Sequence, residues 1–545
     1  MNTTASPAPS EKQVSAWTPF AHGGFTLLWT ATLVSNIGTW MHDVGAGWLM
    51  TTLTPSPATV ALVQAATTAP IFLFALFAGA LADCVDKKKL LIIVNIAMAI
   101  TAGLMTLAVQ SDMMSPALLI IFTFALGAGA AFIAPAWQAV VPSLVPRSAL
   151  QPAIALNSMG INIARAIGPA VAGFLIASVG LVTPFLANLI SLLIIIIALL
   201  AWKSGEKSDN TLPPEPLFGA MLTGLRHALY NDALKATLAR ALGFFVSASA
   251  YWALLPLIAK GIDDNLLGGG AQLYGILLTS TGAAAVIGAL ILPSLRKSMS
   301  ASTLVSLGTL GTAGALLILA LAPYTITAIL GSLLAGVSWI AVLTSLNVSA
   351  QTSLPNWVRA RGLAVLLMVF FGSMTIGSTV WGQVAEQAGI SVALGTAAAS
   401  LLVALPILRN VELGGGENLD LTPALHWAAL PPLPSNSGDR GPVLVTIDYI
   451  IDPDDEAAFL SAIHSLKDER FRDGAYDWGI GQSAENSDQW TEYFLVSSWL
   501  EHERQHARVT HADKNLQADV RKFHKGDMRP RVSHLIAPVK DRGSK

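Results

Sequence analysis

Twelve long apolar runs limit what this chain can fold into more than any other feature. They lie at residues 24–50, 58–82, 90–110, 116–140, 150–178, 182–202, 236–260, 271–293, 301–322, 325–350, 361–386 and 391–409. A helix needs about 20 mostly apolar residues to cross the hydrocarbon core of a bilayer, and each run has roughly that length. Charged residues make up only 12% of the chain and become frequent only after residue 411, whereas a soluble chain is about 25% charged. We therefore predict an all-α membrane protein with twelve transmembrane helices and a soluble C-terminal part.

Lysine and arginine are unevenly distributed over the connections between these runs. One set of alternate connections has none, and the other carries Lys87–Lys89, Arg147, Lys203, Lys207, Arg296, Lys297, Arg359 and Arg361. Basic residues accumulate in cytoplasmic loops, and an even number of spans leaves both ends of the chain on one side. We predict a multi-pass protein of the plasma (inner) membrane with both termini in the cytoplasm.

Glycines and prolines recur at an offset of 209 residues. The matched pairs are Gly79 and Gly288, Gly127 and Gly336, Pro146 and Pro355, Gly168 and Gly377, and Gly173 and Gly382. Matches in three corresponding pairs of spans predict two parallel six-helix repeats. Transporters built in this way bind substrate near the midplane between the repeats and rock one half against the other.

Composition predicts the domain boundaries. They are a disordered N-terminus without a signal peptide (1–20), a first six-helix half (21–203), a cytoplasmic linker (204–232), a second half (233–410), a Pro/Gly linker (411–440), a soluble domain (441–537) and a tail (538–545). In the soluble domain we expect strands at 443–450, 475–482, 492–498 and 531–536, with helices at 453–472 and 499–523. This βαββαβ order favours a ferredoxin-like α+β sandwich.

Two further observations narrow the class of protein. The formal net charge of −2 gives no support for a nucleic-acid partner, and the single cysteine, Cys84, excludes an internal disulfide framework. The expected partners are a small-molecule substrate, protons and the lipid bilayer.

The connection between the second and third runs holds five charges in seven residues: Asp83, Asp86, Lys87, Lys88 and Lys89. An unbroken membrane helix cannot carry this cluster, so we expect a short aqueous turn. Gly79 would let the preceding helix end approach a neighbour closely. The segment resembles the loop between spans 2 and 3 of the major facilitator superfamily, although Cys84 and Asp86 replace the usual Arg and Gly. The resemblance implies an intracellular gate that closes the two halves when the substrate site faces outward.

The fifth run contains Gly160, Gly168, Pro169 and Gly173. This pattern resembles the Gly-Pro motif of the superfamily's proton-coupled exporters. Pro169 removes a backbone donor, and the glycines permit bending and close packing. Ordinary packing of small residues would give the same pattern.

Three stretches resemble the enterobactin-exporter-like, transmembrane secretion effector branch of that superfamily: residues 35–41, 354–361 and 377–382. The resemblance covers nearly the whole chain. It implies that the C-terminal domain is similar to antibiotic-biosynthesis monooxygenase modules, which are dimeric ferredoxin-like folds that use no cofactor. A dimerising or regulatory tail is the expectation, and catalysis by this domain stays open.

Charges inside membrane spans are functional candidates because they are costly. In the first half, Asp43 and Arg165 lie well within apolar runs, and Asn36 and Trp40 share a helix face with Asp43. Asn162 lies one turn before Arg165. A carboxylate that alternates between an apolar site and a cation would couple protonation to conformation. However, Asp43 lies roughly 28 Å along its helix from residue 24, so an exposed Asp near the outer surface, or a static ion pair, would explain it equally well. The arginine that many drug exporters carry in span 4 is absent, because Phe124 stands near its place, and Arg165 is a candidate substitute.

Two histidines of the tail, His502 and His506, are spaced i, i+4, and His511 follows. That spacing can bind zinc, but a metal site needs further ligands and shielding. We expect solvated histidines, with no metal and no cofactor.

The leading hypothesis is a proton-coupled exporter of a small amphipathic molecule, namely a siderophore, a drug or a secondary metabolite. An importer, a different driving ion, or a membrane-tethered enzyme or sensor that uses the C-terminal domain are the alternatives. A membrane anchor does not require two registered repeats, and this favours transport.

Overall fold

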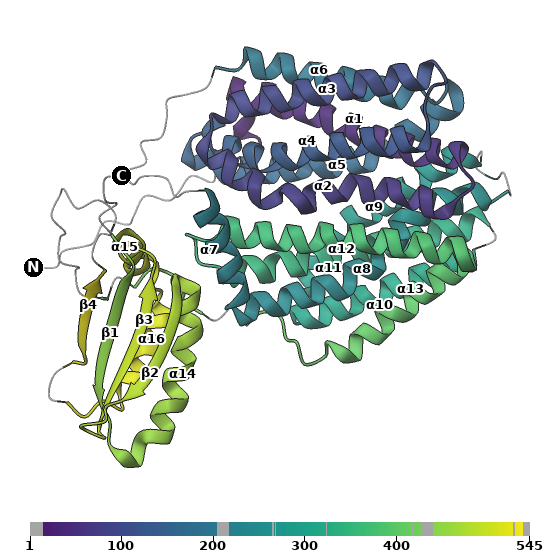
Figure 1. Cartoon of the computed structure of the whole chain (residues 1–545). Coiled ribbons are helices and arrows are strands. Elements are labelled where there is room, and N and C mark those ends of the chain that lie inside the picture. The colour runs from purple at the N-terminus through teal and green to yellow at the C-terminus, as the bar shows by residue number, and fades with distance from the viewer. Residues whose placement is uncertain are drawn as a thin grey trace, which may run out of the picture.

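The computed structural model describes residues 15–203, 217–263, 266, 269–322, 324–415, 419–424, 426–427, 440–526 and 529–537. The predictions for residues 1–14, 204–216, 428–439 and 538–545 lie outside this described part. Figure 1 shows a helical body with a smaller sheet domain at one end. The short helix η1 (Thr18–Ala21) precedes the body.

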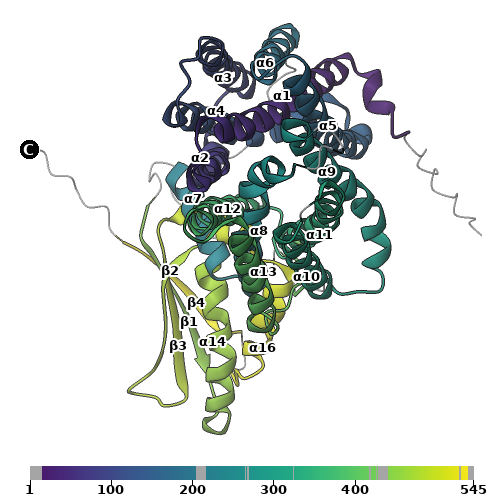
Figure 2. The same cartoon turned by 90° about the vertical axis from the view of Figure 1, so that its right-hand side faces the viewer.

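Within the described residues, the helical body contains two groups of six long helices. The first group is α1 (Gly23–Leu53), α2 (Pro57–Cys84), α3 (Lys87–Gln110), α4 (Pro116–Val140), α5 (Leu150–Ser178) and α6 (Thr183–Ala201). The second is α8 (Asp232–Gly261), α9 (Gly270–Leu295), α10 (Ala301–Ala320), α11 (Thr325–Thr352), α12 (Arg359–Ala388) and α13 (Ile390–Ile407). Each predicted apolar run coincides with one of these helices. Figures 1 and 2 show the two groups as two bundles in contact along their length.

Within the described residues, 11 helices are long and apolar enough to cross a membrane. The remaining long helix, α1, has 31 residues, which is sufficient length, but it is not among the 11. Its central turns hold polar side chains such as Asn36, His42 and Asp43. The protein is a multi-pass membrane protein, and the exact count of twelve spans stays a prediction.

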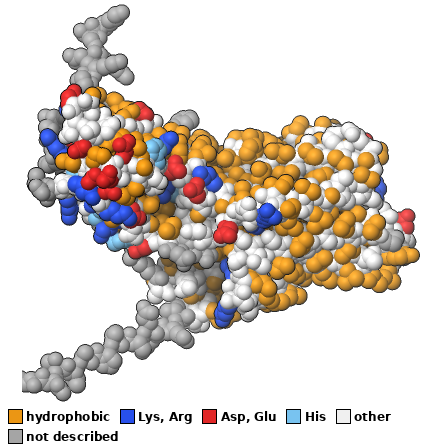
Figure 3. All heavy atoms as spheres, turned by 90° about the horizontal axis from the view of Figure 1, so that it is seen from below, with side chains coloured by type: hydrophobic (Ala, Val, Ile, Leu, Met, Phe, Trp, Pro, Cys, Tyr) orange, Lys and Arg blue, Asp and Glu red, His pale blue; other side chains and the backbone are white. Residues whose placement is uncertain are grey.

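Hydrophobic side chains cover the outside of the helical body (Figure 3), while charged side chains gather on the C-terminal domain. The exposed side chains on the body include Ile93, Leu107, Ile197, Leu290 and Val403. Such a continuous apolar surface matches the hydrocarbon interior of a bilayer.

Glycines that the 209-residue offset pairs make equivalent contacts inside the two halves. A Cβ atom added to Gly127 in α4 would lie 2.9 Å from a backbone oxygen of α2, and one added to Gly336 in α11 would collide with the backbone of α9. Likewise, Gly168 in α5 packs against α1, and Gly377 in α12 packs against α8. The second half therefore repeats the helix contacts of the first, as the duplicated sequence predicts.

The same correspondence holds where the halves meet. A Cβ atom added to Gly173 in α5 would lie 2.9 Å from the carbonyl oxygen of Ala271 in α9. A Cβ atom added to its partner Gly382 in α12 would lie 3.2 Å from Cα of Ala58 in α2. Only residues without a side chain allow backbones to come this close. The two halves are thus joined by two symmetry-related helix pairs, α5 with α9 and α2 with α12.

Helix α7 (Leu217–Leu229) lies in the segment expected to be a linker. It packs against α2 and α12 of the helical body and against α14 of the C-terminal domain. The described part of the central linker is therefore a helix that contacts both halves and the soluble domain.

The C-terminal domain has four strands: β1 (Val443–Ile450), β2 (Ala475–Gln482), β3 (Gln489–Val496) and β4 (Arg531–Ile536). They form one antiparallel sheet in the order β2-β3-β1-β4. The short helix η4 (Pro453–Asp455) and α14 (Glu456–Asp473) connect β1 to β2. Phe459, Ile463 and Leu466 of α14 form the domain core with Tyr449 and Trp490 of the sheet. The predicted order of strands and the α+β class are confirmed.

The predicted helix 499–523 is wrong, because the structure contains two helices there, α15 (Trp499–Arg508) and α16 (His511–Arg521). Thr510 caps α16 in a capping box with Asp513. The chain at Thr422–Ala424 also hydrogen-bonds at the break, since Ala424 N donates to Val509 O and His511 N donates to Thr422 O. This segment, expected to be linker, is therefore part of the C-terminal domain.

Candidate substrate cavity

A cavity of about 310 Å³ lies between the two halves. The first half contributes residues of α1, α2 and α5, namely Trp40, Asp43, Gly47, Val60, Val63, Gln64, Thr67, Thr68 and Arg165. The second half contributes residues of α8, α9, α11 and α12, namely Trp252, Ala253, Pro256, Tyr274, Leu278, Trp339, Leu343, Phe370, Phe371 and Met374. This is the place that a two-repeat transporter uses for its substrate.

Aromatic rings form the wall that the second half provides. Ring centroids lie 5.2 Å apart for Trp252 and Trp339, and 4.5 Å apart for Phe370 and Phe371. Phe245 supports them from behind, 4.4 Å from Phe370. Most of these pairs are edge-to-face, the arrangement that aromatic quadrupoles favour. The wall is therefore a packed and rigid surface for a flat apolar group.

Polar groups are concentrated on the opposite wall. The guanidinium carbon of Arg165 lies 5.7 Å from the centroid of the Trp40 ring, and its Nε is buried with no partner among the described residues. Thr68 and Thr375 share a hydrogen bond of 2.8 Å between the halves. One wall thus offers a cation and hydroxyls, and the other offers rings.

Asp43 is partly buried and lines this cavity. Among the described residues it makes no hydrogen bond and no ion pair. The alternatives of an exposed Asp at the outer surface and of a static ion pair with Arg165 therefore do not describe this conformation. Asp43, Trp40 and Arg165 line the same cavity, while their role stays a prediction.

A second cavity of about 330 Å³ lies inside the first half, and Asp43 and Thr67 line both cavities. Its polar lining includes Ser35, Asn36, Thr39, His42, Asn95, Thr123, Gln138, Asn157 and Asn188. Sequence reasoning missed His42, whose side chain is 4% exposed and whose two ring nitrogens have no partner among the described residues. Its position next to Asp43 inside an apolar run was the available signal.

Two predicted residues occupy other positions. Asn162 donates to the carbonyl of Ser158 at 3.0 Å and lines neither cavity. Asn36 lines the cavity inside the first half rather than the one between the halves.

The glycines and proline of α5 lie at helix contacts. A Cβ atom added to Gly160 would lie 3.5 Å from the ring of Trp29, Gly168 faces Trp40, and Gly173 faces α9. The carbonyl of Pro169 would be 2.6 Å from a Cβ atom added to Gly275. Of this motif, Pro169 and Gly173 lie against α9 of the second half, whereas Gly160 and Gly168 lie against α1 of their own half. Bending of α5 stays a prediction.

Hydrogen bonds between the halves occur at the end of the bundle far from the C-terminal domain. Glu386, near the end of α12, accepts from Ser56 Oγ at 2.7 Å and from the backbone N–H of Ala58 at 3.2 Å. Lys260 donates to the carbonyl of Thr51. Together with the Gly173 and Gly382 contacts, they hold this end closed.

The charged loop between α2 and α3 has structural contacts within the first half. Asp86 caps α3 by accepting from the backbone N–H of Lys89 at 2.9 Å. Lys88 donates to the carbonyl of Trp202 at the end of α6. A Cβ atom added to Gly79 would meet no atom within 4 Å, so the prediction that Gly79 permits a close approach is wrong for this conformation. The side chain of Asp83 and any contact it makes lie outside the described part of the chain, and Lys87 stays a gate candidate.

The C-terminal domain contacts the helical body through aromatic and cationic side chains. Trp357, just before α12, lies under the guanidinium of Arg508 (4.5 Å) and against His227 of α7 (5.6 Å). Tyr230 stacks on Phe471 of α14 at 5.0 Å. These contacts fix the domain at the end of the body where α12 begins.

Comparison with known proteins gives a consistent result. The sequence family described as "Transmembrane secretion effector" matches residues 14–542. A staphyloferrin A transporter of Staphylococcus aureus is 27% identical over 270 residues, which cover 48% of this chain and 64%, or less than two thirds, of that relative. The enterobactin exporter EntS of Escherichia coli O1:K1 is 27% identical over 349 residues, which cover 62% of this chain and 80% of that protein.

Solved structures share the fold of the helical body. A POT family transporter in complex with 5-aminolevulinic acid superposes with a TM-score of 0.60 at 14% identity, covering 71% of this chain and 96% of its own. An inward-facing bacterial homologue of the lysosomal transporter Spinster superposes with a TM-score of 0.52 at 16% identity, covering 72% and 96%.

Proposed function

Because this chain belongs to the transmembrane secretion effector family of the major facilitator superfamily and is a secondary transporter of that type, we propose that it is a proton-coupled exporter of small amphipathic molecules of the siderophore class. The observation that carries the proposal is the cavity between the halves, which has a cationic and hydroxyl-bearing wall facing an aromatic wall. The two relatives, a staphyloferrin A transporter and an enterobactin exporter, point to the same class of cargo.

The chemistry of the walls suits an anionic molecule that carries flat apolar groups. Arg165 is a partly buried cation without a carboxylate partner among the described residues, so an anionic group of the cargo would pair with it. The rings of Trp252, Trp339 and Phe370 offer a stacking surface on the other side. The anionic group of the cargo would thus bind one wall and its apolar group the other, and this accounts for a preference for amphipathic molecules.

Asp43 is the proton-binding group in this proposal. It is the carboxylate that faces both the cavity between the halves and the polar cavity of the first half. A proton on Asp43 removes the cost of a charge in an apolar cavity, and deprotonation becomes favourable when Arg165 or water approaches. Alternation between these states would tie proton release to the rocking of the halves.

Both termini and the C-terminal domain lie in the cytoplasm in this proposal, because the lysines and arginines of the loops accumulate on that side. Accordingly, the closed end with Glu386 and Lys260 faces outward, and the structure corresponds to a state closed to the outside. The C-terminal domain regulates or dimerises the transporter.

The test uses purified protein in proteoliposomes that contain a pH-sensitive dye. A panel of catecholate and carboxylate siderophores is added, and proton movement that depends on each compound is recorded. We expect compound-dependent proton flux in the parent, and we expect Asp43→Asn to abolish the flux while the compound still binds. The matched control is Asp112→Asn, an aspartate in the exposed turn between α3 and α4.

Two results would contradict the proposal. Parental proton flux in Asp43→Asn would exclude this aspartate as the coupling group, and no flux with any siderophore would exclude the cargo class. The direction of transport is tested by comparing cells that contain the protein with cells that lack it. An exporter lowers the amount of cell-associated compound and an importer raises it, and a protonophore serves as the control. Truncation after residue 415 separates transport from tethered catalysis, because efflux that survives the truncation does not depend on the C-terminal domain.

A further inference from the structure

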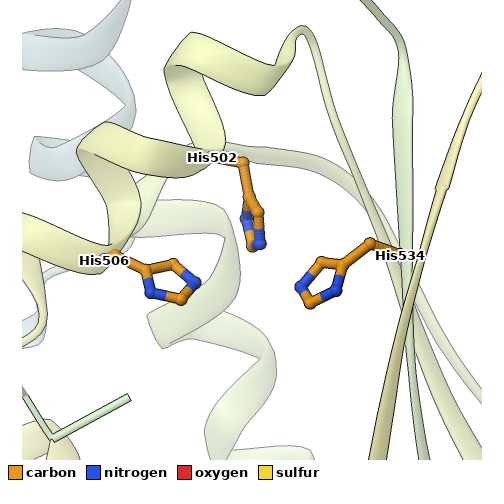
Figure 4. A group of neighbouring side chains, drawn as sticks. All are labelled: His502, His506 and His534. Carbon is orange, nitrogen blue, oxygen red and sulfur yellow. The ribbon is translucent and has the colours of Figure 1, made fainter. Parts of the chain in front are cut away.

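We propose that His502, His506 and His534 form a site for one divalent transition-metal ion in the C-terminal domain. Figure 4 shows the three imidazole rings converging on a common point. One nitrogen from each ring lies within 4.8 Å of the others. The expectation of solvated histidines is wrong for His502, which is only 1% exposed.

The fold assembles the site from two segments that are distant in sequence. His502 and His506 lie one turn apart on α15, so they share a helix face. His534 lies on β4, where the ladder pairs it with Val445 of β1. The centroid of the His502 ring is 4.8 Å from that of His506 and 4.9 Å from that of His534. Secondary structure thus fixes all three backbones around one point.

His502 is oriented as a metal ligand. Its Nδ1 lies 3.0 Å from the side-chain oxygen of Gln505, which can only accept, so Nδ1 carries the proton. The other nitrogen, Nε2, therefore holds a free lone pair, and it is buried without a partner in the described part of the domain. An unpaired buried acceptor costs free energy. A metal ion at the centre of the three rings would accept this lone pair, and Gln505 would act as the supporting partner that metal-binding histidines usually have.

Metal binding requires the three imidazole rings to move slightly closer together. Tetrahedral ligands at about 2.0–2.1 Å from zinc lie roughly 3.3 Å from one another, so each ring would move by about 1 Å from its present place. His506 and His534 are only partly buried and have room for this rotation. Three imidazoles suit Zn²⁺, Co²⁺, Ni²⁺ or Cu²⁺ better than Ca²⁺ or Mg²⁺.

Three protein ligands leave a coordination position open. Beside the rings lies a cavity of about 300 Å³, which is also lined by Trp427, Arg521 and Arg529. Arg470 lines it too, but its charge is balanced by Glu492 at 2.9 Å. The open position would therefore face water or an anionic ligand held by Arg521 and Arg529.

The experiment titrates the purified full-length protein with Co²⁺ and then with Zn²⁺. We expect one Co²⁺ per chain, visible absorption bands of a tetrahedral Co²⁺ complex, and their loss when Zn²⁺ displaces the cobalt. His506→Ala and His534→Ala should each weaken binding at least tenfold. The matched control is His464→Ala, an exposed histidine of α14 outside the cluster, which should bind as the parent does.

Absence of a saturable one-to-one complex would overturn the proposal, as would binding that is unchanged in both cluster variants. A loss of metal affinity in His464→Ala as large as that in the cluster variants would also overturn the proposal. Thermal unfolding of each variant without metal identifies a variant that fails to fold. In that case the parent protein decides, because bound metal should protect the partly exposed His506 and His534 from a histidine-modifying reagent while His464 stays reactive.

Discussion

The closed end of the transporter should open when Gly173 is replaced by alanine. The added Cβ atom would lie 2.9 Å from the carbonyl oxygen of Ala271 and 3.1 Å from Cα of Gly275. Both are backbone atoms, so α5 and α9 must separate, and overpacking of this kind costs about 1–3 kcal/mol. In the proposed rocking of the halves, α5 and α9 separate here when the end opens, so the cost falls on the closed state alone. It should shift the conformational equilibrium toward the open state by about 5- to 150-fold.

The shift can be measured by thiol labelling. The chain has a single cysteine, Cys84, so Gln64→Cys in a Cys84→Ser background places one reactive group in the cavity between the halves. A membrane-impermeant reagent added on the outer side reaches this thiol only when the closed end opens. We expect Gly173→Ala to raise the labelling rate within the range above.

Two further variants sharpen the test. Gly382→Ala, at the symmetry-related contact with α2, should act in the same direction. Gly103→Ala is the matched control, because its Cβ atom would meet only the side chain of Leu189 at 3.9 Å. Labelling at the parental rate in both interface variants, or an equal increase in the control, would show that these glycine contacts do not hold the end closed.

Three more outcomes follow from the structure. Trp252→Ala should raise the half-maximal concentration of an aromatic cargo by up to about tenfold, since one aromatic pair contributes about 0.5–1.5 kcal/mol, and concentration-dependent efflux will check it. Trp357→Ala removes the ring under Arg508, so limited proteolysis should release the C-terminal domain faster than in the parent, and an unchanged rate would refute this docking role. Burial raises the pKa of Glu469 from 4.5 to about 8. The folded state therefore keeps a proton that the unfolded state releases above pH 4.5, and the domain should lose stability as the pH rises toward 8. Glu469→Gln should reduce this pH dependence of the domain's stability, and urea-dependent proteolysis at pH 6 and pH 8.5 will measure it.

Local patterns predicted most of the fold. The apolar runs located the long helices, and the strands 443–450, 475–482 and 531–536 have the predicted bounds, because period and length are properties of a short window. The break between α15 and α16 was not predictable in this way. It depends on hydrogen bonds from Thr422–Ala424, a segment about 85 residues away in the chain.

The candidate site was predictable only in part. Asp43, Trp40 and Arg165 were recognised because polar groups inside apolar runs are conspicuous. The aromatic wall was missed, since aromatic residues are unremarkable in membrane helices and only the packing of four helices brings them together. The sequence showed only His511 near His502 and His506, whereas in the structure His534 of β4 lies beside them. The contact between a helix residue and a strand residue that are distant in the sequence cannot be predicted from sequence spacing.

The unlike walls of the cavity between the halves have a consequence for how such a protein diversifies. The two halves are repeats of one unit, yet the charged residues that line this cavity, Asp43 and Arg165, lie in the first half, and most of the aromatic rings lie in the second. Substitution of aromatic residues in the second half can therefore change the cargo preference, while the proposed proton coupling by Asp43 in the first half is unaffected. Because the two functions lie in different halves, a new cargo specificity can arise without any change in the proton-coupling residues.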